Sequence, residues 1–417
     1  MKRFLPIILA LFLTGCGAAA TSDAVTATEA VQATQKQDGN VSLRVTGSEA
    51  DQAMLAQMAE SFKEKYASEA NIEITVEVLG EADCKNVLLA DVLNAPDVFA
   101  FADDQLISLA ASGVLKQVDN ADAIKSANLA EAVSAASVGD RLYAFPMTAD
   151  NGYFLYYDKS VFTEEDVQTM DGILAAAEAA GKKVGMDWSS GWYTYSFFGN
   201  TGMEFGLNED GVTNFCTWNG SGNGVTGLQV AEAMFAIASH PAFESMVNDE
   251  FIAGVKDGSV AACVSGVWDA ANVKEAWGEN YAAVKLPTYT CGDTQIQMAS
   301  FSGYKMVGVN SYSEDVDWAM KFADWITNEE NQNLRFELRE LGPSNINAAG
   351  SDAVSQAPAI QALLQQSEFA SLQRVGNNYW GPMQTFGETL AAGNPEGKAL
   401  QELLDTMVEG VTASAVN

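Results

Sequence analysis

Two rhythms of hydrophobic and polar positions alternate along the chain from residue 41 onward. Residues 41–45 and 72–78 place an apolar side chain at every second position, which is the spacing of a strand with one buried face. Between these strands, the apolar residues recur every three or four positions, as on one face of a helix: Met54, Leu55, Met58, Phe62 and Tyr66. The pattern predicts a strand, a helix and a strand at the start of the folded part.

The same succession continues to the end of the chain. Further strands are predicted at 98–101, 153–157, 261–264, 282–286 and 304–309. Further helices are predicted at 105–111, 169–180, 228–238, 315–326, 359–366 and 396–411. This alternation favours an α/β fold with a largely parallel sheet, and the number of elements suits two α/β lobes better than one. Ligands of such sheets bind beyond the carboxyl ends of the strands, and residues 102–105 occupy such a place.

The amino-terminal segment carries a targeting pattern. Lys2 and Arg3 precede an apolar run at 7–13 that is too short to span a bilayer. The run leads through small residues into Cys16 and so resembles the lipobox of bacterial lipoproteins. The resemblance implies a signal peptide at 1–15, acylation of Cys16 and attachment to the outer face of the cell membrane by lipid alone. An ordinary cleaved signal peptide is the alternative. Residues 16–40 lack aromatic side chains and are expected to form a flexible tether.

The net charge of the chain limits the classes of ligand that it can bind. The formal net charge is -33, and hydrophobic residues make up 48% of the sequence. An acidic protein of this kind lacks the Lys and Arg patches that nucleic acids or anionic membranes require. An uncharged ligand rich in hydroxyl groups fits this balance better than an anionic one, although solubility alone explains much of the charge.

The cysteines and the single histidine indicate no metal site and no cofactor. Four cysteines besides Cys16 are widely spaced, so disulfides and buried free thiols both remain open: Cys84, Cys216, Cys263 and Cys291. His240 follows a predicted helix in a Ser-His-Pro turn and is expected to be a helix-end residue rather than a catalytic base.

Aromatic residues in loops carry the main functional signal. Trp188, Trp192 and Tyr193 lie among Asp, Ser and Gly, Trp268 follows a predicted strand, and Trp380 stands between glycines. Aromatic faces stack on the apolar face of a pyranose, while nearby carboxylates and amides bind its hydroxyls. These clusters favour a sugar-binding site.

Four segments of the chain each resemble a motif of the same protein family, and the motifs occur in the same order along the chain as in that family. They are residues 254–268 with Leu286 and Pro287, residues 145–159, residues 99–115, and residues 319–343. Together they are similar to extracellular solute-binding proteins of ABC sugar importers, in particular to maltose and maltodextrin binders. The resemblance implies a two-lobed periplasmic-binding-protein-like fold of type II, a monomer that delivers sugar to membrane permease subunits, and no catalytic residues. The implied lobes are 41–149 with 300–348, and 150–299 with 349–417.

The resemblance also implies individual site residues. Asp104 matches the acidic residue that binds sugar hydroxyls, with Phe101 beside it, and either Asp150 or Asn151 matches a carboxylate position at the crossover between the lobes. The stacking positions match Trp192, Tyr193, Trp268 and Trp380, and Glu49 falls near a polar contact. Trp188, from the same loop cluster as Trp192, is also predicted to bind ligand. Two positions depart from the maltose pattern, because Gln105 stands where Arg is common and Ser190 where an acidic residue is common. These departures leave the α-glucan assignment open.

The leading hypothesis is a lipid-anchored, non-enzymatic protein that captures maltose or maltodextrin for an ABC permease. A binder of another oligosaccharide is the alternative within the same class. A secreted glycoside hydrolase would need a carboxylate pair, either Asp103 with Asp104 or Asp150 with Asp269. A starch-adhesion lipoprotein without a transporter is a further alternative.

Overall fold

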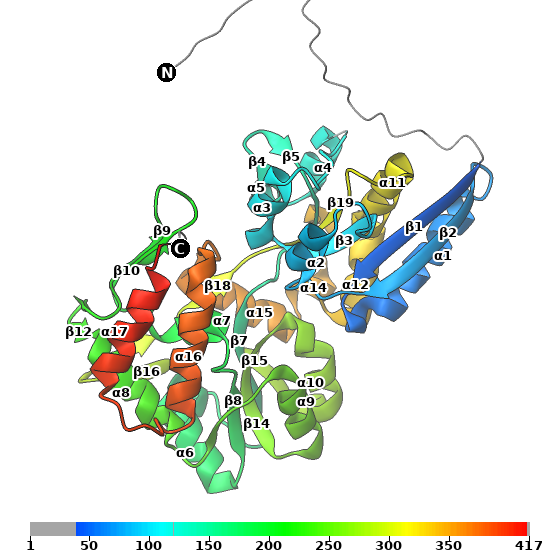
Figure 1. Cartoon of the computed structure of the whole chain (residues 1–417). Coiled ribbons are helices and arrows are strands. Elements are labelled where there is room, and N and C mark those ends of the chain that lie inside the picture. Colours follow the sequence, from blue (N-terminus) through cyan, green and yellow to red (C-terminus); the bar gives the residue numbers. More distant parts are fainter. Residues whose placement is uncertain (1–38, 120, 415–417) are drawn as a thin grey trace, which may run out of the picture. The chain divides into compact units, whose positions relative to one another are not determined.

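The computed structural model describes residues 39–119 and 121–414 (Figure 1). The predicted signal peptide and Cys16 lie outside these residues. Of the predicted tether at 16–40, only Gly39 and Asn40 are described, and Asn40 already begins the first strand. No helix among the described residues is long and apolar enough to cross a membrane.

One five-stranded sheet is built from the start of the chain and a later segment. Its strands, in spatial order, are β2 (Asn71–Val78), β1 (Asn40–Gly47), β3 (Val98–Ala102), β19 (Lys305–Val309) and β6 (Phe145–Thr148). The pairs β1–β2 and β1–β3 are parallel, whereas β19 runs antiparallel to both β3 and β6. The alternating pattern of 72–78 and the apolar run of 98–101 thus both form strands, as predicted.

A second five-stranded sheet has a closely related plan. Its order is β13 (Phe243–Ser245), β8 (Lys183–Met186), β14 (Val260–Gly266), β7 (Tyr153–Asp158) and β15 (Tyr281–Val284). Here β13, β8 and β14 are parallel neighbours, and β7 runs antiparallel to both β14 and β15. The prediction of a largely parallel sheet is therefore confirmed in both lobes, with one exception in each. The exceptions are β19 and β7, which each follow a crossing between the lobes and run opposite to the other four strands of their sheet.

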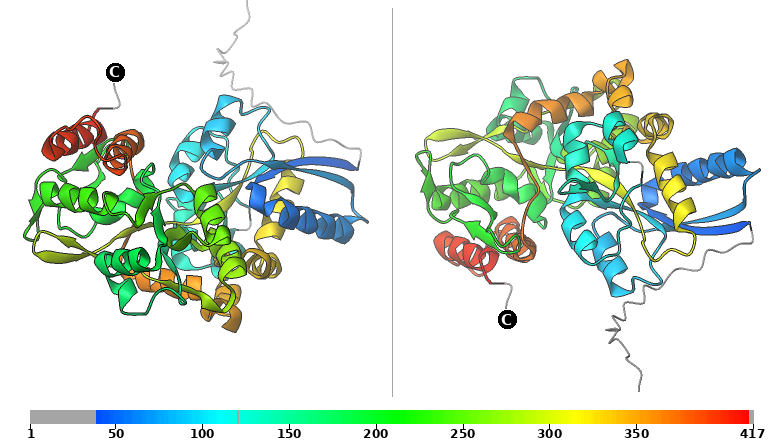
Figure 2. Two further views of the ribbon diagram at one scale, coloured as in Figure 1. Left: turned by 90° about the horizontal axis from the view of Figure 1, so that it is seen from below. Right: turned by 90° about the horizontal axis from the view of Figure 1, so that it is seen from above.

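Helices cover both sheets and divide with them into two lobes (Figures 1 and 2). The helices around the first sheet are α1 (Gln52–Tyr66), α2 (Cys84–Ala90), α3 (Leu106–Ala111), α4 (Ala121–Ala127), α5 (Ala130–Ala135), α11 (Val316–Thr327) and α12 (Glu329–Arg339). The helices around the second sheet are α6 (Met170–Ala180), α7 (Gly191–Thr194), α8 (Gly227–Ala238), α9 (Asn248–Asp257), α10 (Ala270–Trp277), α15 (Pro358–Gln366), α16 (Trp380–Ala391) and α17 (Leu400–Val411). Two short helices, α13 (Ile346–Ala349) and α14 (Asp352–Ser355), precede α15.

Local sequence signals explain where several helices begin and end. Helix α8 starts with a capping box, in which the Thr226 hydroxyl accepts a hydrogen bond from the Gln229 amide and the Gln229 side chain accepts one from the Thr226 amide. Helix α6 ends at Gly181, whose φ of 64° is a left-handed conformation that suits glycine. His240 follows α8, and its Nδ1 accepts a hydrogen bond from the amide of Ala242. This confirms its expected place at a helix end.

The chain passes between the two sheets at segments that begin or end the crossing strands. Residues 149–152 join β6 to β7, and Gly303 and Tyr304 join β18 (Ser300–Ser302) to β19. Phe301, before the second crossing, packs in a core of the second lobe, whereas Met306, after it, packs in the core of the first. The lobes therefore share their crossing strands but bury separate hydrophobic cores.

The four described cysteines are free thiols. Burial raises the pKa of the Cys84 thiol to about 12, so this thiol is protonated and unreactive at neutral pH. Of the two alternatives that the sequence left open, free thiols are therefore the one found.

Candidate functional site

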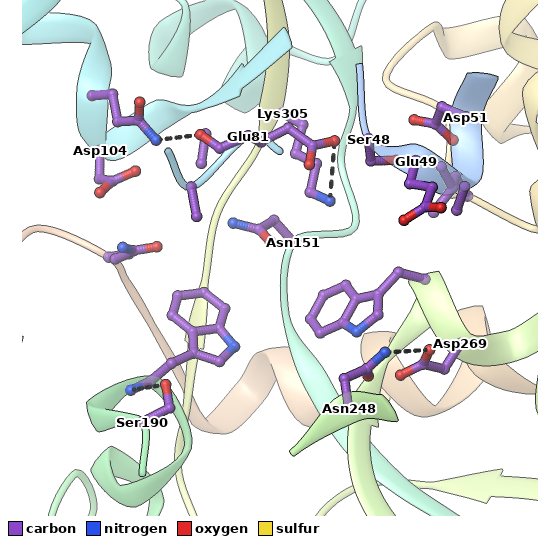
Figure 3. A pocket seen from close by; sticks show the side chains of 18 of the residues that line it. Ser48, Glu49, Asp51, Glu81, Asp104, Asn151, Ser190, Asn248, Asp269 and Lys305 are labelled. Atoms are coloured by element: carbon purple, nitrogen blue, oxygen red, sulfur yellow. Dashed lines mark hydrogen bonds and ion pairs between the residues drawn. The ribbon is translucent and has the colours of Figure 1, made fainter. Parts of the chain in front are cut away.

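A cavity of about 1140 Å³ lies between the two lobes. Its walls come from loops that follow the carboxyl ends of parallel strands in both sheets, as the general rule for open α/β sheets predicts. The first lobe contributes Ser48 and Glu49 after β1 and Asp104 after β3, and the second contributes Trp268 and Asp269 after β14. Figure 3 shows Asp104, Glu81, Lys305 and Glu49 along one side of the cavity, Ser190, Asn248 and Asp269 along the other, and Asn151 between them.

Asp104 presents a carboxylate with unused hydrogen-bonding capacity. Its Oδ1 is buried and has no partner in the structure. Burial, followed by the negative charge of Asp103, raises the pKa of Asp104 to about 6, while Lys85 and Arg374 act in the opposite direction. An unpaired buried acceptor costs stability unless a ligand donor satisfies it, so Asp104 is suited to accept a hydrogen bond from a bound hydroxyl.

Gln105 lines the cavity but uses its amide within the protein. Its Nε2 donates a hydrogen bond of 2.6 Å to the Glu81 carbonyl, and its Oε1 accepts one of 2.9 Å from the Lys85 amide. Gln105 therefore fastens the loop before α2 to the loop after β3 and keeps Lys85 and Asp104 on the same wall.

Two tryptophans of the second lobe pack against buried aromatic rings. Trp192 stacks on Phe301 with ring centroids 5.4 Å apart, and its amide donates to the Ser190 hydroxyl at the start of α7. Trp380, the first residue of α16, packs edge-on against Tyr379, with centroids 5.0 Å apart. Both Trp192 and Trp380 are half-buried and line the cavity, so each has apolar ring surface available to a ligand.

A third tryptophan lies beside a lysine that reaches both lobes. The Lys305 ammonium lies 3.6 Å from Glu81 Oε1 of the first lobe and 5.5 Å from the ring centroid of Trp268 in the second. This geometry is a cation–π contact combined with an ion pair. The carboxylates of Glu81, Asp150 and Asp51 outweigh the effect of burial on Lys305, so its pKa is raised and it carries a charge.

Asp269 is the second carboxyl on the cavity wall that has a raised pKa. The Ser265 hydroxyl donates to it at 2.6 Å and the Asn248 side-chain amide at 3.3 Å. Burial outweighs these hydrogen bonds and raises the pKa of Asp269 to about 6. Asp104 and Asp269 thus give each lobe one cavity-lining carboxyl with a raised pKa.

A buried ion network supports the floor of the cavity. Asp51 binds Arg339 at 3.1 Å and Arg335 at 3.4 Å. Arg335 is 2% exposed, and its Nε and Nη2 have no hydrogen-bond partner in the structure. Within this network, Asp51 and Arg339 line the cavity and Arg335 does not, so Arg335 influences the site only through its ion pair with Asp51.

The structure brings together most of the residues that the sequence singled out. The predicted site residues that line the one cavity are Glu49, Asp104, Gln105, Asn151, Trp192, Trp268 and Trp380. Of the two alternatives at the crossover, Asn151 lines the cavity and Asp150 does not. Asp150 is 2% exposed and accepts a hydrogen bond from the Gly342 amide, which links the crossing at 149–152 to the segment between α12 and α13.

Three other predicted contacts are corrections. Phe101 is fully buried in the core of the first lobe, because all of residues 98–101 in β3 are buried whichever face they point to. Trp188 is fully buried between Phe197 and Phe243, with centroid distances of 5.3 and 4.8 Å. Tyr193 packs on Tyr153 at 5.1 Å and does not line the cavity.

Several lining residues carried no signal in the sequence. Lys305, Glu81, Arg339 and Gln373 line the cavity but stand in ordinary positions at strand starts, loops or helix ends. Asp269 was singled out only as half of a hydrolase pair. Its neighbour Trp268 was the signal that could have identified it as a wall residue.

A cavity lined from two lobes by three indole rings and by carboxylate and amide groups defines a ligand-binding protein of the two-lobed periplasmic type. Comparison with known proteins narrows this class. A family model described as bacterial extracellular solute-binding protein matches residues 57–362, and the chain belongs to this family.

The relatives found by sequence are moderately distant. The galactooligosaccharide-binding protein of Bacillus subtilis (strain 168) is 26% identical over 75% of this chain and 76% of its own length. The maltodextrin-binding protein MdxE of the same organism is also 26% identical, over 75% of this chain and 76% of its own length. A maltooligosaccharide ABC transporter solute-binding lipoprotein of Streptococcus pneumoniae serotype 4 (strain ATCC BAA-334 / TIGR4) is 24% identical over 69% of this chain and 70% of its own length.

Solved structures agree with the fold over most of the chain. A structure solved with acarbose superposes with a TM-score of 0.78 at 28% identity and covers 89% of this chain and 98% of that one. The maltodextrin-binding protein MalE1 of L. casei BL23, solved without ligand, gives a TM-score of 0.71 at 24% identity and covers 89% of this chain and 99% of its own. The predicted two-lobed fold and the predicted family are thus confirmed.

Proposed function

We propose that this protein is the lipid-anchored solute-binding component of an ABC importer and that it captures oligosaccharides of the maltodextrin type. The observation that carries the proposal is the cavity itself, where Trp192, Trp268 and Trp380 share the wall with Asp104, whose buried Oδ1 has no hydrogen-bond partner. Indole faces stack on the apolar faces of hexoses, and the carboxylate accepts from a sugar hydroxyl. Three separate platforms suit a chain of sugar units better than a single monosaccharide.

The names of the relatives support oligosaccharide as the ligand class but divide on the sugar. Two relatives bear names that state maltooligosaccharide or maltodextrin binding, and one bears a name that states galactooligosaccharide binding. Gln105, which stands where maltose binders often have Arg, uses its amide to fasten two loops and so does not supply the charged donor of that arrangement. A galactooligosaccharide is therefore the second candidate within the same class.

The glycoside hydrolase alternative has little support in the geometry. Asp103 is 1% exposed and is paired with Arg374, and Asp150 is paired with a backbone amide, so neither lines the cavity. Each carboxylate pair that the sequence offered thus lacks one member at the site, whereas a hydrolase needs both carboxyl groups on the scissile bond.

We further propose that the lobes, 41–149 with 300–348 and 150–299 with 349–417, close over the sugar and that the permease recognises the closed form. A ligand that touches both walls binds the closed state more tightly than the open state and so shifts the population toward it. Lys305 contacts Glu81 of the first lobe and Trp268 of the second, so closure of the lobes would change the surroundings of its ammonium group.

Calorimetric titration with maltotriose, maltotetraose and a galactotriose tests the ligand. The maltodextrin proposal expects binding of both glucans and a weaker response to the galactan. Stronger binding of the galactotriose would move the assignment to the second candidate, and the absence of heat with every oligosaccharide would refute the class. The anchoring proposal is tested separately by metabolic labelling with a palmitate analogue, which should label the wild type and not the Cys16→Ser variant.

A further inference from the structure

An ion pair at the hinge side of the cavity has no role in the site as described so far. Arg374 Nη1 donates to Asp103 Oδ2 at 2.7 Å. The Asp103 side chain is completely buried, whereas that of Arg374 is 38% exposed. Asp103 follows β3 of the first lobe, and Arg374 follows β20 (Ala370–Leu372), which pairs with β18 next to the crossing. The pair therefore joins the first lobe to a segment that leads into α16 of the second.

Asp103 is fixed on its other side by the crossing segment. Its Oδ1 accepts a hydrogen bond of 3.1 Å from the Tyr304 amide, and its own amide donates one of 3.0 Å to the Tyr304 carbonyl. The preceding residue is Gly303, where an added Cβ would come within 2.6 Å of Asp103 Oδ1 and 3.1 Å of Asn151 Nδ2. Asp103 thus cannot relocate without moving the backbone of the crossing.

The residues beside the two partners face the cavity. Asp104 follows Asp103, and Gln373 precedes Arg374, and both line the cavity although Asp103 and Arg374 do not. Asp104 has one buried oxygen without a partner. The charged groups that act on it are Asp103 in the same turn, Lys85 on α2 and Arg374 on the segment after β20. Of these, only Asp103 disfavours the ionised form of Asp104.

We propose that Arg374 is a positioning residue for Asp104: by pairing with Asp103 it holds the turn after β3 against the hinge and cancels the negative charge beside Asp104, so that Asp104 stays ionised to accept a hydroxyl of the ligand. The role in ligand binding rests on the proposed function, whereas the effect on Asp104 is a property of the protein without ligand. A raised pKa of Asp104, to about 6, agrees with a carboxylate that is only just kept charged at neutral pH.

If Arg374 acts through its charge, its removal should shift the titration of Asp104, whereas loss of a purely structural contact should not. Arg374→Gln leaves Asp103 as an uncompensated buried charge beside Asp104, so the titration of Asp104 should move to higher pH. Asp103→Asn removes the repelling neighbour, so the titration should move to lower pH. In the double variant both charges are absent, and Asp104 should titrate close to the wild-type midpoint. Arg44→Gln, which opens the exposed pair with Glu77 in the first lobe, is the matched control and should leave Asp104 unchanged.

The first measurement uses the protein without sugar. Carbon-13 labelling of aspartate side chains, with the Asp104 signal assigned by its loss in Asp104→Asn, follows the titration of this carboxyl by NMR. An Arg374→Gln midpoint equal to that of the wild type, or a double variant that stays at the Arg374→Gln midpoint, would overturn the proposal. Because no ligand is present, this result does not depend on which sugar the protein binds.

The second measurement is the affinity for maltotriose between pH 6 and pH 8. Arg374→Gln should lose about tenfold in affinity at neutral pH, part of the loss should be recovered at pH 8, and Asp103→Asn should restore binding in the double variant. A loss that is the same at every pH and is not restored would show a purely structural role and refute the positioning. If the wild type binds no oligosaccharide, the proposed function fails, while the NMR result still decides the effect of Arg374 on Asp104.

Discussion

The hydroxyl of Tyr379 donates a hydrogen bond of 2.8 Å to the carbonyl of Gly191, and both residues are buried. Gly191 begins α7, where Trp192 follows, and Tyr379 precedes Trp380 at the start of α16. An added Cβ at Gly191 would meet Met383 at 2.9 Å and the Tyr379 ring at 3.1 Å, so the two helix starts are in direct contact. This one hydrogen bond sets the spacing of two tryptophans on the cavity wall.

Tyr379→Phe should therefore affect both stability and binding. The change removes one of the two hydrogen bonds that the buried Gly191 carbonyl accepts, the other coming from the Tyr195 amide, and we expect a loss of about 1 kcal/mol in the free energy of unfolding. Maltotriose affinity should fall as well, because α7 and α16 lose their link. Urea denaturation and calorimetry measure the two effects. Tyr312→Phe, at a 49% exposed tyrosine, is the control and should change neither quantity.

Removal of the indole rings should weaken binding without unfolding the protein. Trp192→Ala, Trp268→Ala and Trp380→Ala should each cost roughly 2 kcal/mol of binding free energy, since half-buried tryptophans at a binding site behave as hot spots. Fluorescence titration with maltotriose follows the loss. Trp318→Ala, on α11 against Phe62 and Tyr66, removes an indole that does not line the cavity and should leave the affinity unchanged. Equal losses in all four variants would point to general destabilisation instead.

Asp104 should reduce the stability of the ligand-free protein at neutral pH. Its pKa in the folded protein, about 6, lies above the ordinary aspartate value of 3.8. A group with a raised folded pKa stabilises the fold at low pH and loses that contribution as the pH rises through about 6. Asp104→Asn should thus raise the free energy of unfolding by on the order of 2 kcal/mol at pH 7, with the gain vanishing near pH 4.

The same substitution should lower the affinity for sugar, because an amide is a weaker acceptor than a carboxylate. Urea denaturation at several pH values measures the effect on stability separately from the effect on sugar affinity, with Asp140→Asn as an exposed control. Loss of stability in Asp104→Asn at pH 7 would contradict the view that this buried charge is kept for binding.

Asp51 should be the most sensitive position on the cavity floor. Asp51→Asn leaves the buried guanidinium of Arg335 without its counter-charge, and breaking a buried pair in this way costs about 3–5 kcal/mol. Glu77→Gln opens the exposed pair with Arg44 and should cost less than about 1 kcal/mol. Denaturation midpoints compare the two directly, and similar losses would show that burial of the Arg335 pair is unimportant.

Periodicity predicted seven of the ten strands in the two large sheets and the longer helices α1, α6, α8, α11 and α17, but it missed β6, β8, β13 and helices such as α9, α10 and α12. It also did not predict the order of the strands. The predicted strand at 304–309 corresponds to β19, and nothing in its pattern shows that it enters between β3 and β6 in the antiparallel sense. Strand direction is set by where the chain crosses between the lobes, which is a property of the tertiary fold. Helix α16 was not predicted, because Gly381 and Pro382 follow Trp380 and place it in an apparent loop. Proline is nevertheless tolerated in the first turn of a helix, where its missing amide has no acceptor.

Site residues could be predicted where the neighbouring sequence marks a loop aromatic. They could not be predicted where the role of a side chain depends on whether the fold buries it. Loop aromatics beside small polar residues identified Trp192, Trp268 and Trp380, all of which line the cavity. The same signal failed for Trp188, since a loop tryptophan and a buried one look alike until Phe197 and Phe243 are brought against it. Lys305 escaped notice because its importance depends on Glu81 and Trp268, which come from opposite lobes.

The position of β19 inside the first sheet also constrains how the chain can fold. While the polypeptide is being synthesised, β3 and β6 emerge well before residues 305–309. Until β19 arrives, β3 has one unpaired edge and β6 has no strand partner in this sheet. The whole second sheet precedes β19 in the sequence and can form in that interval. Contacts of such large sequence separation slow folding and leave unpaired edges open to aggregation. The first sheet is therefore completed after the second, and a chain truncated before residue 305 would leave β3 with an open edge and β6 without a strand partner in this sheet.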